Sequence, residues 1–258
     1  MKRQTMRRRE EWFDDESFWR ATYPFLFTPE KLEGTGDEID RALELTSIRG
    51  GAALDLCCGP GRAAVALAER GFEVTGVDLT PYLLSKARRR ARAAGVNVRF
   101  VRQDMRDFRS AERFDLVVSM FSSIGYFEDR EDDRRVFRNA FASLRPGGKC
   151  VFELAGRESI AQRFQPTSSK RLPDGSLLVE RREILEDWTR IHNEWIVVRE
   201  GRAERFDFGL RLFSGQELRQ ELEGAGFEVR LHGSLDGEPY APGALRLIAV
   251  GTRPAKGD

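Results

Sequence analysis

The stretch Leu54-Asp55-Leu56-Cys57-Cys58-Gly59-Pro60-Gly61 decides the fold. It follows a short apolar run that begins at Ala52, and it precedes a segment with helical apolar spacing that ends at Gly71. Glycines between a strand and a helix let the backbone turn tightly and approach a ligand without a Cβ in the way. Free N–H groups at the start of the helix favour a carboxylate or a phosphate. The stretch therefore predicts a ligand-binding turn between a first strand and a first helix.

Working outward from this turn, strand-like and helix-like segments alternate. Strands are expected at 52–57, 72–78, 96–102, 114–120 and 148–154, with helices at 62–70, 81–94 and 132–144. Thr80 is expected to cap the second of these helices, which begins with Pro81. This alternation is typical of βαβ units, so we expect a doubly wound, mainly parallel sheet with helices on both faces. Ligands of such sheets bind at the carboxyl ends of the strands.

Two segments lie outside this pattern. Residues 10–46 have a helical pattern with many aromatic side chains near their start. Residues 168–213 have short apolar runs without long helices between them, which indicates antiparallel strands. The alternating pattern then resumes with a helix capped by Ser214 and two strands at 227–231 and 245–251. The predicted fold class is therefore α/β, with seven strands in the main sheet and an inserted antiparallel sheet.

The composition excludes several function classes. The 43 Lys and Arg residues balance the 42 Asp and Glu residues, so no global field attracts nucleic acid or an anionic membrane. No apolar run approaches the roughly 20 residues of a membrane span. Three cysteines form neither a disulfide framework nor a zinc site, so we expect a reduced, cytoplasmic protein. The basic start, Met1 to Arg9, is interpreted as a solvated tail, with an RNA-binding arm as the alternative.

Carboxylates distinguish between two candidate cofactors. Gly59-Pro60-Gly61-Arg62-Ala63-Ala64 also fits the dinucleotide fingerprint, so NAD is a candidate. Asp78, at the end of the second strand, is placed to accept hydrogen bonds from ribose hydroxyls in either cofactor. Asp104, at the end of the third strand, is placed to meet an adenine amino group. Asp55, inside the first motif, is placed near a ligand's ammonium group. Three carboxylates at successive strand ends favour cationic S-adenosylmethionine (SAM) over an anionic pyrophosphate.

Several ordered motifs resemble those of class I SAM-dependent methyltransferases. Residues 54–61 look like motif I, Val77-Asp78 like motif II, and Gln103-Asp104-Met105 like the acidic motif of the third strand. Residues 114–120 and 144–149 are similar to motif IV and to the turn before the fifth strand. The resemblance covers roughly residues 50–155 and implies a Rossmann-like methyltransferase fold. The cofactor residues that it implies are Asp55, Cys57, Gly59, Gly61, Arg62, Asp78, Leu79, Asp104, Met105 and Met120.

One residue departs from the family pattern. Cys57 occupies the position of the first glycine of motif I. A cysteine tolerates a strand-like backbone, so we expect Cys57 to keep such a backbone and to change only the wall of the site.

The resemblance also implies a domain organisation. Residues 1–49 would form an N-terminal helical cover, 50–160 the SAM-binding core, 161–213 an inserted antiparallel lid, and 214–258 the completion of the core sheet. Residues 120–127 should line the acceptor pocket. They lack the Asn/Asp-Pro-Pro-aromatic pattern of enzymes that methylate exocyclic base nitrogens. Tyr23, on the cover, is the residue best suited to reach the methyl donor.

Three of the four acceptor-side candidates also have a plainer interpretation. Tyr23 and Tyr126 are candidates for catalysis, but Tyr126 could equally serve packing. His192 is either a general base or an exposed strand histidine. Arg211 either holds an acidic acceptor or pairs with a core carboxylate. No cluster has metal-ligand spacing, which indicates metal-independent chemistry.

The sequence thus predicts SAM-dependent methyl transfer to an O or N atom of a small-molecule acceptor, by a monomer or homodimer without membrane or nucleic-acid partners. Two tryptophans of the insertion, Trp188 and Trp195, form either its core or a substrate cage. The alternatives are an RNA methyltransferase, a SAM-binding protein without catalytic activity, and an NAD-binding oxidoreductase.

Overall fold

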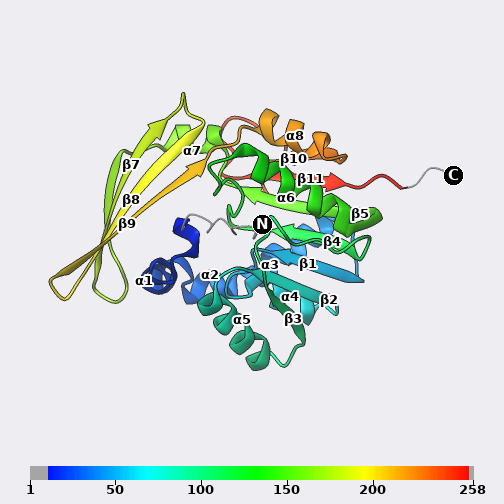
Figure 1. Cartoon of the computed structure of the whole chain (residues 1–258), viewed down its shortest axis with the longest axis horizontal. Coiled ribbons are helices and arrows are strands. Elements are labelled where there is room, and N and C mark those ends of the chain that lie inside the picture. Colours follow the sequence, from blue (N-terminus) through cyan, green and yellow to red (C-terminus); the bar gives the residue numbers. More distant parts are fainter. Residues whose placement is uncertain (1–10, 256–258) are drawn as a thin grey trace, which may run out of the picture.

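The structure, a computed structural model, describes residues 11–255. A large twisted sheet lies at the centre with helices on both faces, and a smaller sheet projects from one end (Figure 1). The basic start of the chain, for which an RNA-binding arm was the alternative, lies outside the described residues.

The large sheet has seven strands in the order β10-β11-β5-β4-β1-β2-β3. Neighbouring strands from β3 to β5 run parallel, while β11 runs antiparallel to both β5 and β10. This confirms the predicted mainly parallel, seven-stranded sheet. Its strands are β1 (Ala52–Leu56), β2 (Glu73–Asp78), β3 (Val98–Arg102), β4 (Phe114–Ser119), β5 (Leu144–Leu154), β10 (Glu228–His232) and β11 (Leu247–Thr252).

Helices cover the sheet because successive side chains of each buried strand point to opposite faces. On β1, Ala53 packs with one hydrophobic cluster and Leu54 with the other. Helices α3 and α4 contribute to the Ala53 side, whereas α6 and α8 contribute to the Leu54 side. The helices are α1 (Glu16–Leu26), α2 (Pro29–Glu33), α3 (Thr35–Thr46), α4 (Arg62–Glu69), α5 (Pro81–Ala93), α6 (Arg130–Ser143), α7 (Arg157–Arg163) and α8 (Gly215–Gly224), with a short 3₁₀ helix η1 (Trp12–Asp14).

The inserted segment forms the predicted antiparallel sheet. Its strands pair in the order β6-β7-β8-β9 and are β6 (Thr167–Arg171), β7 (Leu177–Leu185), β8 (Arg190–Arg199) and β9 (Arg202–Arg211). Helix α1 lies beside this sheet in Figure 1, where Phe18 packs against Trp195 and Phe208. We call β6–β9 the lid sheet. Aromatic contacts therefore join the N-terminal helices to the lid sheet.

Three local details differ from the sequence predictions. The N-terminal segment is divided into η1, α1, α2 and α3 instead of being uniformly helical. Strand β5 begins at Leu144, before the glycine turn, because Leu144 pairs with Phe114 across a register shift. Thr80 occupies the N-cap of α5, but its side chain makes no capping hydrogen bond. Ser214, by contrast, forms a complete capping box with Glu217.

Gly61 is required where α4 begins close to α5. Its φ is +77°, and an added Cβ would lie 2.9 Å from the Cβ of Ala87 on α5. Gly71, with a φ of +84°, has open space around its Cβ position. The two glycines thus share a left-handed backbone, but only Gly61 is also confined by a neighbouring helix.

We expect Gly61→Ala to destabilise the protein more than Gly71→Ala. Both variants incur the left-handed strain of about 1–2 kcal/mol, and Gly61→Ala adds an overpacking cost of about 1–3 kcal/mol. Equilibrium unfolding in urea measures the difference. Equal losses of unfolding free energy in the two variants would contradict this account of the α4–α5 contact.

Candidate cofactor and acceptor site

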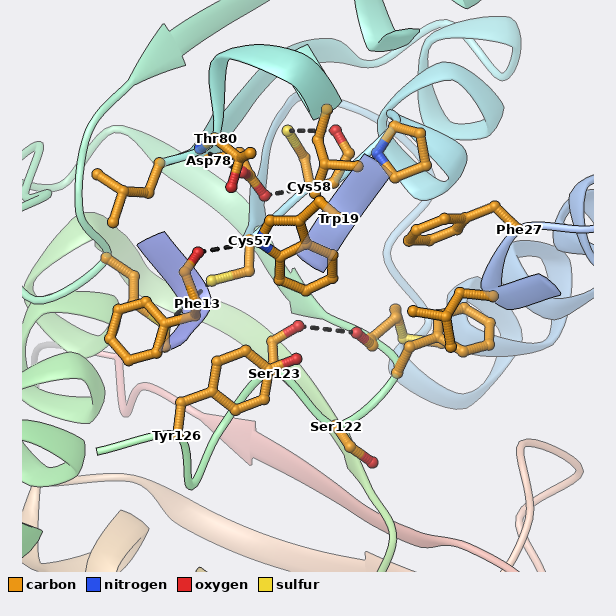
Figure 2. A pocket seen from close by; sticks show the side chains of 18 of the residues that line it. Phe13, Trp19, Phe27, Cys57, Cys58, Asp78, Thr80, Ser122, Ser123 and Tyr126 are labelled. Atoms are coloured by element: carbon orange, nitrogen blue, oxygen red, sulfur yellow. Dashed lines mark hydrogen bonds between the residues drawn. The ribbon is translucent and has the colours of Figure 1, made fainter. Parts of the chain in front are cut away.

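A cavity of about 350 Å³ lies at the carboxyl ends of β1, β2, β3 and β4 (Figure 2). It is the place where ligands of doubly wound sheets bind. Gly61 is absent from its lining, because this glycine faces α5 instead. The other predicted cofactor residues all line the cavity: Asp55, Cys57, Gly59, Arg62, Asp78, Leu79, Asp104, Met105 and Met120.

Asp78 fixes the glycine turn. One carboxylate oxygen accepts a hydrogen bond from the N–H of Gly59 at 2.8 Å, and the other accepts from the N–H of Thr80 at 2.8 Å. Burial raises the pKa of Asp78, while these two N–H donors oppose the rise. The carboxylate therefore ties the end of β2 both to the loop after β1 and to the start of α5.

Asp55 supports the start of α4. Its carboxylate accepts a hydrogen bond from the N–H of Ala64 at 2.8 Å. Burial raises the pKa of Asp55 to about 7, with a further rise from the nearby charge of Asp78. Arg62 and the Ala64 N–H act in the opposite direction. A buried carboxyl group that is poised between its two charge states near neutral pH thus faces the cavity.

Asp104 is held by an arginine to which the sequence analysis gave no role. Arg106 donates to both carboxylate oxygens of Asp104, from Nε to Oδ1 at 3.1 Å and from a terminal nitrogen to Oδ2 at 2.7 Å. The same guanidinium donates to Glu11 at 2.6 Å and to Asp132 at 2.9 Å. Asp104 therefore meets a ligand as a carboxylate that is already ion-paired, not as an isolated charge.

The strand-like backbone on which the expectation for Cys57 rested is not the one observed. The φ of Cys57 is +61°, in the left-handed region where glycine is favoured. The turn after β1 requires this conformation, so the glycine of the family pattern is replaced without a change of backbone. The Cys57 thiol donates to the Met105 sulfur at 3.1 Å, and burial raises the pKa of Cys57 well above its ordinary value.

Arg62 lies beneath the loop that follows β4. Its guanidinium stacks 3.6 Å from the centre of the Phe121 ring and donates to Thr35 at 2.8 Å and to Glu38 at 3.1 Å. Phe121 and Ser122 both have positive φ values. The stacked arginine thus supports a strained loop at the edge of the cavity.

Aromatic side chains cover the cavity from the N-terminal helices and the lid sheet. The Trp19 indole donates to the carbonyl oxygen of Phe13 at 2.9 Å, which fixes both residues over the glycine turn (Figure 2). Lys31 also lines the cavity and was missed in the sequence, where a single lysine on a short helix carries no signal. The aromatic part of the lining comprises Trp12, Phe13, Phe18, Trp19, Phe27, Phe121, Tyr126, Phe127, Trp195 and Phe208.

Comparisons with known proteins agree with this geometry. A family model described as a methyltransferase domain matches residues 53–148. The chain is 31% identical over 198 residues to a protein of Bacillus subtilis (strain 168) named putative methyltransferase YqeM, covering 75% of this chain and 80% of that one. The chain belongs to the class I SAM-dependent methyltransferases. SAM is accordingly its cofactor.

More distant similarities involve methyltransferases of different acceptors. The ubiquinone biosynthesis O-methyltransferase of Coxiella burnetii (strain Dugway 5J108-111) is 33% identical over 43% of this chain and 46% of its own length. A dTDP-3-amino-3,4,6-trideoxy-alpha-D-glucopyranose N,N-dimethyltransferase of Streptomyces venezuelae is 35% identical over 39% of this chain and 40% of its own length. This chain therefore spans less than half of either relative.

The fold of the methyltransferase is shared with solved structures. A SAM-dependent methyltransferase of Clostridium acetobutylicum ATCC 824 superposes with a TM-score of 0.76, covering 93% of this chain and 98% of that one at 17% identity. This likeness includes nearly the whole chain, so it extends beyond the core that the family model matches.

Two acceptor-side candidates of the methyltransferase lie outside the cavity lining. Tyr23 is not among the lining residues, because its ring packs against Phe27 and Tyr82. Arg211 pairs with the fully buried Asp133 at 3.3 Å, which is the core-carboxylate alternative. Asp133 also accepts from the N–H of Gly125 at 3.0 Å, and burial raises the pKa of Asp133 to about 6. Arg211 and Asp133 thus position the loop after β4.

Of the other two candidates, Tyr126 lines the cavity and His192 does not. Tyr126 lines the cavity, with its ring 4.6 Å from that of Trp12, and burial raises the pKa of its hydroxyl. His192, on β8, lies 3.4 Å from Asp207 and lines a neighbouring cavity instead. Of the two lid tryptophans, Trp195 lines the cofactor cavity, whereas Trp188 is 36% exposed and packs against Phe164.

No group of three or more His, Cys, Asp or Glu side chains within residues 11–255 is arranged to hold a metal ion. Over the same residues, no helix has the length and apolar character needed to cross a membrane.

We expect Cys57→Gly to be more stable than Cys57→Ala. Both variants lose the thiol, but only glycine adopts a φ of +61° without strain. The expected difference in unfolding free energy is about 1 kcal/mol. Thermal or urea unfolding of both variants measures it. An alanine variant as stable as the glycine variant would show that the backbone at residue 57 relaxes away from the left-handed region.

Proposed function

We propose that this methyltransferase transfers the methyl group of SAM to an O or N atom of a small-molecule acceptor. One observation carries the proposal: a single cavity contains both the glycine turn with its carboxylates and the aromatic side chains of the lid sheet. Cofactor and acceptor can therefore meet in one shared space. The relatives that methylate a ubiquinone precursor oxygen or an amino sugar nitrogen, by their names, support both kinds of acceptor atom.

The cavity lining fits SAM in its chemistry. In our assignment, Asp78 accepts from the ribose hydroxyls and Asp104, steadied by Arg106, lies at the adenine. Asp55 pairs with the ammonium group of the methionine part. A carboxylate offers about four lone-pair positions, so Asp78 can bind a ligand while it holds Gly59 and Thr80. Arg62 and Lys31 supply positive charge for the methionine carboxylate.

The aromatic cover supports a role in excluding water. Bound SAM supplies an electrophilic methyl group, so the chain needs mainly to align the acceptor and keep the site dry. Tyr126, whose raised pKa keeps its hydroxyl protonated, would donate a hydrogen bond to the acceptor and not remove a proton from it. His192 lines the neighbouring cavity beside Asp207 and does not line this one, so our proposal gives it no role in removing a proton from the acceptor.

The division of the chain belongs to the same proposal. We assign residues 1–49 to the helical cover, 50–160 to the SAM-binding core, 161–213 to the lid and 214–258 to the completion of the core. The four strands of the lid sheet all lie within 161–213, which supports this division.

Ligand-dependent unfolding tests the cofactor assignment. A ligand at 100 times its dissociation constant stabilises the folded state by about 2.7 kcal/mol, or about 5–10 °C in melting temperature for a chain of this size. We expect SAM and S-adenosylhomocysteine (SAH) to raise the melting temperature, and NAD to leave it unchanged. Stabilisation by NAD and not by SAH would contradict the SAM assignment and indicate that the glycine turn binds a dinucleotide.

The matched variants for this experiment are Asp78→Asn and Glu73→Gln. Both residues lie on β2, but Asp78 lines the cavity and Glu73 is exposed at the opposite end of the strand. The side-chain oxygen of asparagine can still accept a hydrogen bond from one of these two backbone N–H groups, so part of the anchoring of the turn is kept. We expect the SAH shift to fall in Asp78→Asn and to persist in Glu73→Gln.

The affinity for SAM should increase with pH through neutrality. The pKa of about 7 at Asp55 means that its ionised fraction rises about tenfold between pH 6 and 8. Because the ionised carboxylate attracts an ammonium group, the dissociation constant of SAM should fall by up to this factor. Isothermal titration across this range measures it. A pH dependence that persists unchanged in Asp55→Asn would contradict the assignment of Asp55.

A further inference from the structure

A second cavity of about 400 Å³ adjoins the cofactor cavity and has no role in the account above. The two cavities share four lining residues, Trp12, Phe13, Tyr126 and Phe208. The remaining residues around the second cavity are largely polar or charged: Glu11, Arg106, Glu128, His192, Asp207 and Gly209.

The shared wall consists of side chains from three separate parts of the chain. Trp12 belongs to η1, Tyr126 to the loop after β4, and Phe208 to β9 of the lid sheet. Their rings are in direct contact, with Trp12 4.6 Å from Tyr126 and 5.1 Å from Phe208. The two cavities are therefore separated by side chains alone, with no strand of the large sheet between them. A ligand long enough to reach past the wall would then touch both.

The charges around the second cavity favour a cation. Three carboxylates line it, from Glu11, Glu128 and Asp207, against one guanidinium, from Arg106. Arg106 is already bound to Glu11, Asp104 and Asp132, so it offers an incoming anion little attraction. Asp207 is paired with Arg205 and lies beside His192.

Glu128 supplies the charge that has no partner within residues 11–255. Its backbone carbonyl accepts from Arg211 and Arg190, but no hydrogen bond or ion pair of its carboxylate occurs in this part of the chain. Glu128 is exposed, so an incoming ligand can reach its carboxylate from solvent. The aromatic wall adds a second attraction, because ring faces attract cations.

We propose that the second cavity binds the ammonium group of an amphipathic amine whose apolar end receives the methyl group in the cofactor cavity. The proposal rests on the function proposed above and names its acceptor class. A protonated amine has no lone pair with which to attack a methyl group. The ammonium group is therefore a recognition group, and the accepting O or N atom lies at the other end of the molecule.

Three small phenols of nearly equal size test the charge preference. Tyramine ends in an ammonium group, tyrosol in a hydroxyl group and 4-hydroxyphenylacetate in a carboxylate. At about pH 7.5 the tyramine amine is protonated and its phenol is neutral. We expect titration calorimetry on SAH-saturated protein to give tightest binding for tyramine, weaker binding for tyrosol and the weakest for 4-hydroxyphenylacetate. The expected difference between the first and the last is about tenfold or more.

Variants at the cavity locate this preference. We expect Glu128→Gln to lower the tyramine affinity to that of tyrosol, and Glu128→Lys to invert the order of tyramine and 4-hydroxyphenylacetate. Glu204→Gln removes an exposed carboxylate from β9 outside both cavities and should change neither affinity. SAH binding should be equal in all four proteins, which shows that the variants are folded.

Two failures are distinguishable. Loss of SAH binding in the wild-type protein would overturn the proposed function itself. If SAH binds but tyramine does not, only the amine proposal is overturned. The same holds if the three phenols bind equally, or if the Glu128 variants behave like Glu204→Gln.

Discussion

The two hydrogen bonds that the Asp78 carboxylate accepts hold together the part of the chain on which the methyltransferase depends. One comes from Gly59 and fixes the turn after β1, and the other comes from Thr80 and fixes the start of α5. A buried carboxylate is costly unless donors satisfy it, so this position is strongly constrained. The glycine turn, the start of α5 and the floor of the cavity therefore share one anchor, with acceptor positions left over for a ligand.

A second set of charges meets at Asp104, on the wall of the cavity. The Arg106 guanidinium binds Glu11, Asp104 and Asp132, which lie near the N-terminus, after β3 and on α6. Removing one charged side chain from such a buried network leaves the charges of the others uncompensated. Arg211 and Asp133 make a similar connection between the lid sheet and the loop after β4. Ionic contacts thus join the cover and the lid to the core, together with hydrophobic packing and a backbone hydrogen bond from Arg211 to Gly125.

Much of the core could be predicted because its signals are local. The run from Ala52 to Leu56 and the one from Phe114 to Ser119 are buried strands with apolar residues on both faces, and glycines and Ser214 mark the helix ends. The acidic residues at strand ends converge on the cavity because parallel strands end at one edge of a sheet. Tyr23, on the other hand, was expected at the methyl donor, but its ring packs against Phe27 and Tyr82.

The sequence by itself determined the doubly wound sheet, the lid insertion and the carboxylates that face the cofactor cavity, because period, turn residues and strand-end positions are properties of neighbouring residues. Only the tertiary structure decided the partners. In the structure, Arg106 pairs with Asp104, Arg211 pairs with the buried Asp133, and Cys57 has a left-handed backbone. The tertiary structure also formed the second cavity, whose Glu128 and Asp207 are far apart in the sequence. Such contacts depend on how separate elements pack, which no local pattern records.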